Sequence, residues 1–228
     1  MLSHYMYRNL TEGGDRAMCG RYTVLTEDEL IEVRSIINEV SLKIARDELT
    51  SLHEPRHEVA PSNNAPVITS NRGDLLFEHA KFGFERWDGK GVIINARAET
   101  AKDKPMFKNY VSRGRCVVPA SGYYEWKPEA NQRKKVKHLI KDQSGNLLFM
   151  AGLYRDGRDG REFVIITKDP VGEVAGIHDR MPVILKTDQL EPWLTGDLPI
   201  DDLTGLDYDC SVEPCEAPGN VEQLTLLD

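Results

Sequence analysis

The chain is organised around the stretch Met18-Cys19-Gly20-Arg21, close to its beginning. An initiator methionine is normally removed when a small residue such as cysteine follows, so a start at Met18 would make Cys19 the first residue. Its α-amine and its thiol would then lie on adjacent carbons. An α-amine has a pKa of about 7.7–8.0, against about 10.4 for lysine, so much more of it is an uncharged nucleophile at neutral pH. We therefore interpret Cys19 as a reactive 1,2-aminothiol.

The residues before Met18 are polar and contain no apolar run, so they resemble neither a signal peptide nor a membrane anchor. We expect residues 1–17 to be an extension or a removed leader, with Met18 as the probable start. No segment approaches the roughly 18 apolar residues that span a bilayer, and we expect no membrane partner. The absence of an export signal predicts a cytoplasmic protein.

The cysteines fit a reducing compartment, in which disulfides are rare; they are Cys19, Cys116, Cys210 and Cys215. Cys210 and Cys215 could form half of a metal site. No second Cys or His pair follows at the spacing of a zinc site, so the preferred interpretation is two ordinary thiols. We predict no metal and no other cofactor.

Charge is distributed unevenly along the chain. The net charge is −8, yet residues 97–141 contain 12 Lys and Arg against four acids, and residues 186–228 contain one basic residue and 11 acids. A basic segment inside an acidic protein predicts a surface that faces phosphate groups. The alternative for the cluster Arg133-Lys134-Lys135-Val136-Lys137 is a solvated hairpin tip.

Hydrophobic periodicity predicts many short strands and few helices, which indicates one compact α+β domain that is mainly β. A long helix is expected from Thr26 to about Glu48, because Thr26 and Glu29 form a capping-box pattern. Short helices are expected over 99–101, 107–111, 171–176 and 187–194. The expected strands cover 20–25, 67–69, 75–84, 92–96, 116–119, 123–127, 136–141, 147–153, 162–167 and 181–185. The pair 67–69 and 75–84 is expected to turn at Asn71-Arg72-Gly73-Asp74. Residues from Thr195 onward are interpreted as an acidic tail.

Polar residues occur at the ends of several expected elements. These stretches are Cys19-Gly20-Arg21, Asn95-Ala96-Arg97, Glu125-Trp126 and His178-Asp179-Arg180. Each also has a structural interpretation: Asn95 could cap a helix, Glu125 could pair with Arg97 on the surface, and His178 could be a turn histidine. Perturbed polar groups mark function only in some cases.

Five motifs in this order resemble the SOS response-associated peptidase (SRAP) family over residues 18–215. They are Met18-Cys19-Gly20-Arg21-Tyr22, Val59-Ala60-Pro61, Ile94-Asn95-Ala96-Arg97-Ala98-Glu99-Thr100, Gly122-Tyr123-Tyr124-Glu125-Trp126-Lys127 and Ile177-His178-Asp179-Arg180-Met181-Pro182. The resemblance implies a single catalytic domain, built as a partly open β-barrel with peripheral helices and a positively charged channel.

Members of this family crosslink covalently to abasic sites in single-stranded DNA, as part of DNA repair and the SOS response. The resemblance therefore implies single-stranded DNA as the partner and a nucleoid-associated protein. It makes Cys19 the reacting residue, surrounded by three catalytic residues: Asn95, Glu125 and His178. It also implies that the DNA path includes Arg21, Arg97, Trp87, Thr167 and Pro61.

The chemistry of these residues suits that reaction. The Cys19 amine would form a Schiff base with the sugar aldehyde, and the thiol would close a thiazolidine ring in an intramolecular step. Glu125 and His178 would serve as general acids and bases. Asn95 can hold the amine or a sugar oxygen without titrating. A Schiff base also permits β-elimination, which predicts weak lyase activity.

The remaining roles concern DNA. Arg21 and Arg97 would bind phosphates, and Trp87 would stack on a base or plug its loop onto the core. Glu58 stands where the family commonly has Asn, and an acidic side chain there would repel phosphate. The C-terminal Gln223-Leu224-Thr225-Leu226-Leu227 resembles peptides that bind replication sliding clamps, with Gln223, Leu226 and Leu227 as contacts. Its alternative is a disordered acidic tail in residues 216–228.

Two other functions stay open. One is a thiol peptidase or amidohydrolase that uses Cys19 with His178 and removes its own leader, although no oxyanion-hole motif is recognisable. The other is a noncatalytic single-strand binding module that uses the basic segment 97–141.

Overall fold

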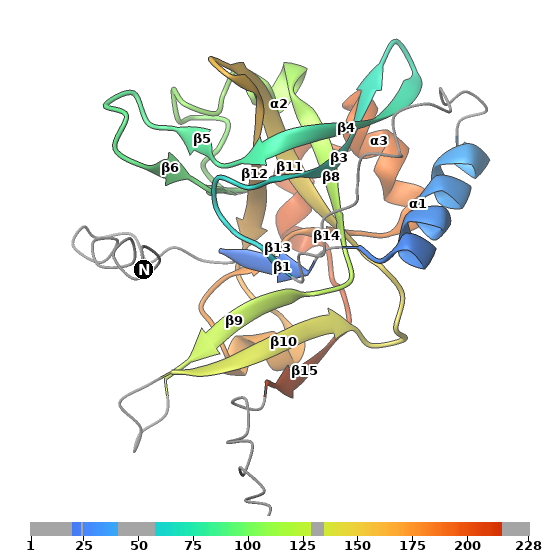
Figure 1. Cartoon of the computed structure of the whole chain (residues 1–228), viewed down its shortest axis with the longest axis vertical. Helices are drawn as coiled ribbons and strands as arrows, with labels where there is room; N and C mark the ends of the chain where they lie inside the picture. Colours follow the sequence, from blue (N-terminus) through green and yellow to red (C-terminus); the bar gives the residue numbers. More distant parts are fainter. Residues whose placement is uncertain (1–19, 24, 41–57, 129–134, 216–228) are drawn as a thin grey trace, which may run out of the picture.

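The computed structural model describes residues 20–23, 25–40, 58–128 and 135–215. Cys19, the expected leader 1–17 and the C-terminal peptide with Gln223, Leu226 and Leu227 lie outside these residues. The described chain is built mainly from strands, which form a barrel and a five-stranded sheet (Figure 1).

The first half of the chain contains β1 (Arg21–Thr23), α1 (Glu27–Val40), β2 (Glu58–Val59), β3 (Asn64–Asn71), β4 (Asp74–Phe82), β5 (Phe84–Glu85), β6 (Val92–Ile93), β7 (Asn95–Arg97), α2 (Tyr110–Arg113) and β8 (Arg115–Ala120). The second half contains β9 (Tyr123–Lys127), β10 (Val136–Asp142), β11 (Leu148–Gly157), β12 (Gly160–Lys168), η2 (Gly172–Gly176), β13 (Met181–Pro182), β14 (Ile184–Leu185), η3 (Thr187–Gln189), α3 (Leu190–Thr195), η4 (Ile200–Gly205) and β15 (Cys210–Pro214).

The barrel is a ring of five strands. Its strands pair in the order β12-β4-β3-β8-β11, and β11 pairs back onto β12. The parallel junction between β12 and β4 covers only two residue pairs, whereas β11 and β12 pair over six. Three short strands, β7, β13 and β14, extend the barrel wall. These findings confirm the predicted α+β, mainly β architecture and its barrel.

The second sheet has the order β15-β10-β9-β1-β2. In Figure 1 its strands β9, β10 and β15 occupy the lower part of the molecule, with β1 between them and the barrel. Side chains alternate across β9: Tyr123 and Glu125 are buried, whereas Tyr124 and Trp126 are only half-buried. This alternation is expected of a strand with one face on the core. The sheet therefore has an inner face, which bears Glu125, and an outer face, which bears Trp126.

Two hydrophobic clusters use alternate residues of the same barrel strands. On β8, Val117 belongs to the cluster that also contains Trp193 of α3 and Val33 of α1. Cys116 and Val118 belong to the other cluster, which also contains Tyr22 and Tyr123 of the five-stranded sheet, among others. Each face of the barrel wall is thus covered by a different part of the chain, and α1 and α3 lie on the same side of the molecule in Figure 1.

Local signals predicted several elements correctly. The Thr26 amide donates to Glu29 Oε2 at 2.6 Å and the Glu29 amide donates to Thr26 Oγ1 at 3.3 Å, so the capping box is confirmed. The expected part of this helix beyond Val40 lies outside the described residues. The β3–β4 hairpin turns at Arg72 and Gly73, whose φ angles of 53° and 91° are those of a two-residue turn with both central residues left-handed.

Other expected elements differ from the structure. The strand expected over 92–96 is two short strands, because β6 pairs with β5 while β7 pairs with β12. Residues 98–109 form hydrogen-bonded turns rather than a helix at 99–101, and 172–176 is a 3-10 helix. The segment interpreted as a tail from Thr195 contains η4 and β15, and β15 pairs with β10. No helix in the described ranges is long and apolar enough to cross a membrane.

Candidate active site

Glu125 and His178 approach each other at the inner face of the five-stranded sheet. His178 Nε2 lies 3.9 Å from Glu125 Oε2, and both side chains are largely buried. Glu125 lies there because of the alternation along β9, and the His178 amide donates to the Val174 carbonyl at the end of η2 (3.1 Å). The interpretation of Glu125 as a surface residue is therefore wrong. A separation of 3.9 Å is too long for a direct hydrogen bond between the two groups. An atom placed between them can lie within hydrogen-bond distance of both.

The second ring nitrogen of His178 has two neighbours. Nδ1 is 3.2 Å from the Arg180 amide, a donor, and 2.8 Å from Asp179 Oδ1, an acceptor. The first contact fits a neutral ring whose proton is on Nε2, facing Glu125. The second fits a ring whose proton is on Nδ1, as in the other neutral tautomer or in the protonated ring. The surroundings of His178 thus offer Nδ1 a partner in either tautomer.

Asn95 carries a buried amide that forms no hydrogen bond with the described residues. Neither its Oδ1 nor its Nδ2 has a partner in the part of the chain that the structure describes. Asn95 is the first residue of β7, level with Ile165 of β12, so the interpretation as a helix cap is wrong. An unsatisfied buried polar group costs about 1–3 kcal/mol, and such a group in a folded protein calls for an explanation. A ligand that reaches the amide would supply one.

Gly20 lies between the strands that carry Glu125 and Asn95. The β1–β9 register pairs Arg21 with Tyr124 and Tyr22 with Tyr123. Continuing this register by one residue brings Gly20 level with Glu125. On another side, a Cβ added at Gly20 would be 3.5 Å from Ile94 Cδ1, next to Asn95 in the chain. The described chain therefore begins beside the candidate catalytic side chains.

Arg180 anchors the segment that carries His178. Its terminal nitrogens donate to Glu99 at 2.8 and 2.7 Å, to Asp169 at 2.5 Å and to the Thr167 carbonyl at 2.7 Å. Burial opposes ionisation of Glu99, but the hydrogen bonds and charge of Arg180 outweigh it and lower the pKa of Glu99. The sequence interpretation did not identify this role, since Glu99 and Arg180 are far apart in the chain.

The residues expected along a DNA path fall into two groups. Arg97 on β7 and Pro61 in the turn after β2 are exposed. Trp87, in the β5–β6 loop, is 91% exposed, so the alternative that it plugs onto the core is wrong. Thr167 is fully buried, and its carbonyl accepts from Arg180 and from the Ala98 amide. Its Oγ1, like the Asn95 amide, has no hydrogen-bond partner among the described residues, and the DNA contact expected of Thr167 stays a prediction.

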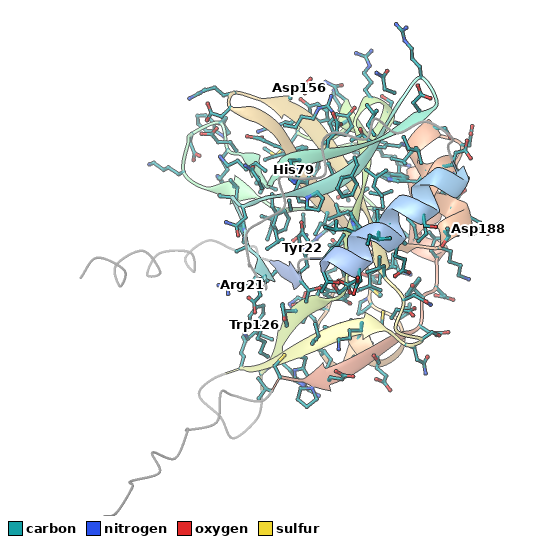
Figure 2. All side chains as sticks on the ribbon, turned by 45° about the vertical axis from the view of Figure 1, so that its right-hand side comes forward. Arg21, Tyr22, His79, Trp126, Asp156 and Asp188 are labelled. Carbon is teal, nitrogen blue, oxygen red and sulfur yellow. The ribbon has the colours of Figure 1, made fainter. Side chains whose placement is uncertain are left out.

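Arg21 lies on the outer face of the five-stranded sheet, close to Trp126 (Figure 2). Its Nη1 donates to Glu58 Oε2 at 3.2 Å. Glu58 also accepts a hydrogen bond from Lys137. The carboxylate that was expected to repel phosphate is thus neutralised by two cations, which no local sequence signal indicated.

The other thiols differ from a reactive cysteine. Cys116 is buried on β8, and desolvation raises its pKa far above the ordinary range. Burial, together with Asp142 and Asp209, raises the pKa of Cys210 to about 12. Both groups are therefore protonated at neutral pH. Within the described ranges, no three His, Cys, Asp or Glu side chains are grouped as a metal site would require.

The sequence of the chain is similar to those of known proteins. Residues 18–210 match the family described as SOS response associated peptidase (SRAP). The chain belongs to this family. It is 34% identical over 188 residues to the Abasic site processing protein YoqW of Bacillus subtilis, which covers 78% of this chain and 80% of that protein. It is 31% identical over 144 residues to the Abasic site processing protein YedK of Escherichia coli, covering 61% of this chain and 64% of that protein.

More distant proteins share the fold or part of the sequence. The SRAP chain is 27% identical over 197 residues to the Abasic site processing protein HMCES of Xenopus tropicalis, covering 69% of this chain and 59% of that protein. A crystal structure of a protein from Bacteroides thetaiotaomicron superposes with a TM-score of 0.70 at 23% identity, covering 87% of this chain and 92% of that chain. This second likeness shows that the two proteins have the same fold.

Proposed function

We propose that this SRAP protein processes abasic sites in single-stranded DNA by bonding covalently to them through Cys19. The single observation that carries the proposal is the placement of Gly20, the residue after Cys19, between the Glu125 and Asn95 strands. The names of its relatives, abasic site processing proteins, support the substrate.

The reaction needs no external oxidant or reductant. In a chain that begins at Cys19, the α-amine adds to the aldehyde of the opened sugar and loses water to give an imine. The Cys19 thiol then adds across the C=N bond, and its proton passes to the nitrogen, which closes a five-membered thiazolidine. Because the second attack is intramolecular, proximity supplies several kcal/mol of its barrier.

Glu125 and His178 supply the proton transfers. Loss of water from the first adduct requires a proton on oxygen and removal of one from nitrogen. A carboxylate and an imidazole separated by 3.9 Å can perform these steps on the oxygen and the nitrogen of one bound adduct. Such general acid–base roles typically contribute about 10²–10⁴ in rate. The Asn95 amide, whose two polar atoms have no hydrogen-bond partner among the described residues, would hydrogen-bond to the sugar oxygen or to the amine.

The DNA strand would reach this site along exposed side chains. Arg97 is the last residue of β7, two residues after Asn95, and would bind a phosphate. Trp87 is available to stack on a base, since its ring is nearly fully exposed. Thr167 is buried and accepts from Arg180 through its carbonyl, and its hydroxyl stays a predicted DNA contact.

Two secondary activities follow from the same chemistry. The imine permits β-elimination at the 3′ phosphate, so we propose weak lyase activity. If residues 1–18 precede Cys19 in the cell, they must be removed before its amine is free, and the Cys19 thiol with His178 is a candidate for that cleavage.

The C-terminal peptide with Gln223, Leu226 and Leu227 stays a prediction for sliding-clamp binding. Deletion of residues 220–228 should abolish binding to the cognate clamp.

Borohydride trapping tests the amine's role. Protein starting at Cys19 is mixed with a single-stranded oligonucleotide that contains one abasic site, and borohydride is added at successive times. We expect an early reducible adduct that gives way to a borohydride-resistant one as the thiazolidine forms. Glu125→Gln should slow both stages by about 10²-fold or more. If no reducible adduct forms at any time, the imine step is wrong.

A further inference from the structure

On the outer face of the five-stranded sheet, one carboxylate occupies a site made by two cations. The Glu58 carboxylate forms one ion pair with Arg21 Nη1, 3.2 Å away, and a second with Lys137 Nζ. The three residues come from β2, β1 and β10, so the pairing is formed by the fold and not by neighbours in sequence. Their side chains are 26–37% exposed, and solvent or a ligand can reach them.

Two aromatic rings form the wall of the same site. Lys137 Nζ lies 3.7 Å from the centre of the Tyr124 ring, and Trp126 has Arg21 Cζ at 5.9 Å and Lys137 Nζ at 5.8 Å from its ring centre. The register explains the arrangement, because Arg21 stands opposite Tyr124 and Trp126 opposite Lys137 on one face. Cations beside flat apolar rings form the combination that binds phosphates and bases of single strands.

We propose that Arg21 and Lys137 form a binding site for a backbone phosphodiester, and that Glu58 occupies this site in the DNA-free protein. This inference rests on the proposed function, since it takes single-stranded DNA as the ligand. A phosphodiester carries one negative charge on two free oxygens, as a carboxylate does. A phosphate can therefore take the place of Glu58 with the same two partners.

Replacement of the Glu58 carboxylate by a phosphate at Arg21 and Lys137 should change the free energy of the protein–DNA system little. Desolvation opposes the charge of Glu58, but hydrogen bonds and charge from Lys137 and Arg21 outweigh it and lower the pKa of Glu58, so the carboxylate is ionised at neutral pH. Ion pairs that are this exposed contribute little stability each. Glu58 thus weakens DNA binding at this site without closing it.

The consequence is selectivity for damaged DNA. Counterion release from phosphate contacts supplies most of the affinity for undamaged DNA. Glu58 reduces that affinity for every sequence equally, whereas a covalent bond forms only at an abasic site. A protein with Glu58 therefore leaves undamaged strands more readily and is retained at the lesion.

The test measures binding of a fluorescent, undamaged single-stranded oligonucleotide by anisotropy at several salt concentrations. Glu58→Gln should tighten binding on the order of fivefold at low salt, as expected from the loss of two exposed ion pairs. The slope of log affinity against log salt should steepen by about 0.7, since one additional phosphate contact adds about that much for single strands. Thermal unfolding of each variant checks that it is folded.

Glu213→Gln is the matched control. It changes the net charge by the same amount and breaks an ion pair with Lys141 on the same sheet, at 3.5 Å. We expect less than a twofold change in affinity. If Glu213→Gln tightens binding as much as Glu58→Gln, the effect is one of net charge and the inference is wrong.

Lys137→Met provides a second route to the answer. In the Glu58→Gln background, Lys137→Met should weaken binding of the undamaged oligonucleotide about fivefold. In the native background it should weaken that binding less than twofold, because Glu58 already neutralises Lys137 there. Equal losses in both backgrounds would overturn the inference. The proposed function is scored separately, by covalent retention of an abasic oligonucleotide. If that retention is absent while undamaged binding responds as described, the phosphate site stands and the covalent reaction does not.

Discussion

Arg180 binds Glu99 with both of its terminal nitrogens, at 2.8 and 2.7 Å. Glu99 follows β7, the strand of Asn95 and Arg97, and Arg180 lies two residues after His178. This pair therefore joins the two segments whose side chains would share one substrate. Neither residue needs to touch the DNA for the site to depend on it.

Arg180→Met is expected to lower the free energy of unfolding by about 2–3 kcal/mol, because it leaves Glu99 and the Thr167 carbonyl without their partner. It should also slow crosslinking, since the His178 segment loses its anchor. Chemical denaturation and the crosslinking rate, measured well below the unfolding midpoint, check the two effects. A variant that is destabilised but crosslinks at the native rate would show that Arg180 has a structural role alone.

Glu99→Gln should change how stability depends on pH. Arg180 lowers the pKa of Glu99 in the folded protein, whereas the unfolded value is about 4.3. The ionised Glu99 therefore contributes stability that is complete above about pH 4.3 and is lost as the pH falls through the lower, folded value. Unfolding curves of both proteins from pH 3 to 7 should differ most at the high end, and converge toward acid. A difference that grows toward acid would contradict this sign.

Asn95→Ala separates function from stability. Its amide atoms make no hydrogen bond with the described residues, so their removal breaks none and relieves an unsatisfied buried group. We expect a melting temperature equal to or above that of the native protein, with crosslinking at least about tenfold slower. A marked fall in the melting temperature would mean that the amide has a structural partner.

Trp87→Ala tests the exposed ring in the β5–β6 loop. Because Trp87 is 91% exposed, its removal should change the free energy of unfolding by less than about 0.5 kcal/mol. Loss of a stacked base should weaken single-strand binding by about 1–3 kcal/mol. Trp193→Phe is the contrasting variant, since buried Trp193 donates to the Cys116 carbonyl and its replacement should affect stability instead. Unchanged DNA affinity in Trp87→Ala would remove this residue from the DNA path.

Much of the fold could be predicted because its signals are local. The Thr26 and Glu29 capping box lies within four residues, and the β3–β4 hairpin is set by the left-handed turn at Gly73. The barrel strands are indicated in the sequence by apolar runs such as Cys116–Val118, which are buried on both faces.

The elements that were predicted wrongly depend on distant partners. The run 92–96 reads as one strand, but its halves pair with β5 and with β12, and no local pattern marks the division at Ile94. β15 is a short, half-buried strand in an acidic segment, and it forms only because β10 offers an edge.

The candidate site divides in the same way. Residue types and motif order identified Asn95, Glu125 and His178, and the fold brings Glu125 and His178 within 3.9 Å. Partners separated by long stretches of chain were not predictable. Glu58 stands 37 residues from Arg21 and 79 from Lys137, so no local pattern could show that two cations neutralise its carboxylate.

The most direct test of the central claim is a denaturing gel. Protein starting at Cys19 is incubated with a labelled single-stranded oligonucleotide carrying one abasic site, with an undamaged oligonucleotide and the variants Cys19→Ala and Cys19→Ser alongside. We predict a heat- and detergent-stable shifted band for the native protein with abasic DNA only. Cys19→Ala should give none, and Cys19→Ser only an adduct that borohydride must stabilise. A folded native protein that leaves the abasic strand unshifted, or a Cys19→Ala variant that shifts it equally, would contradict the account.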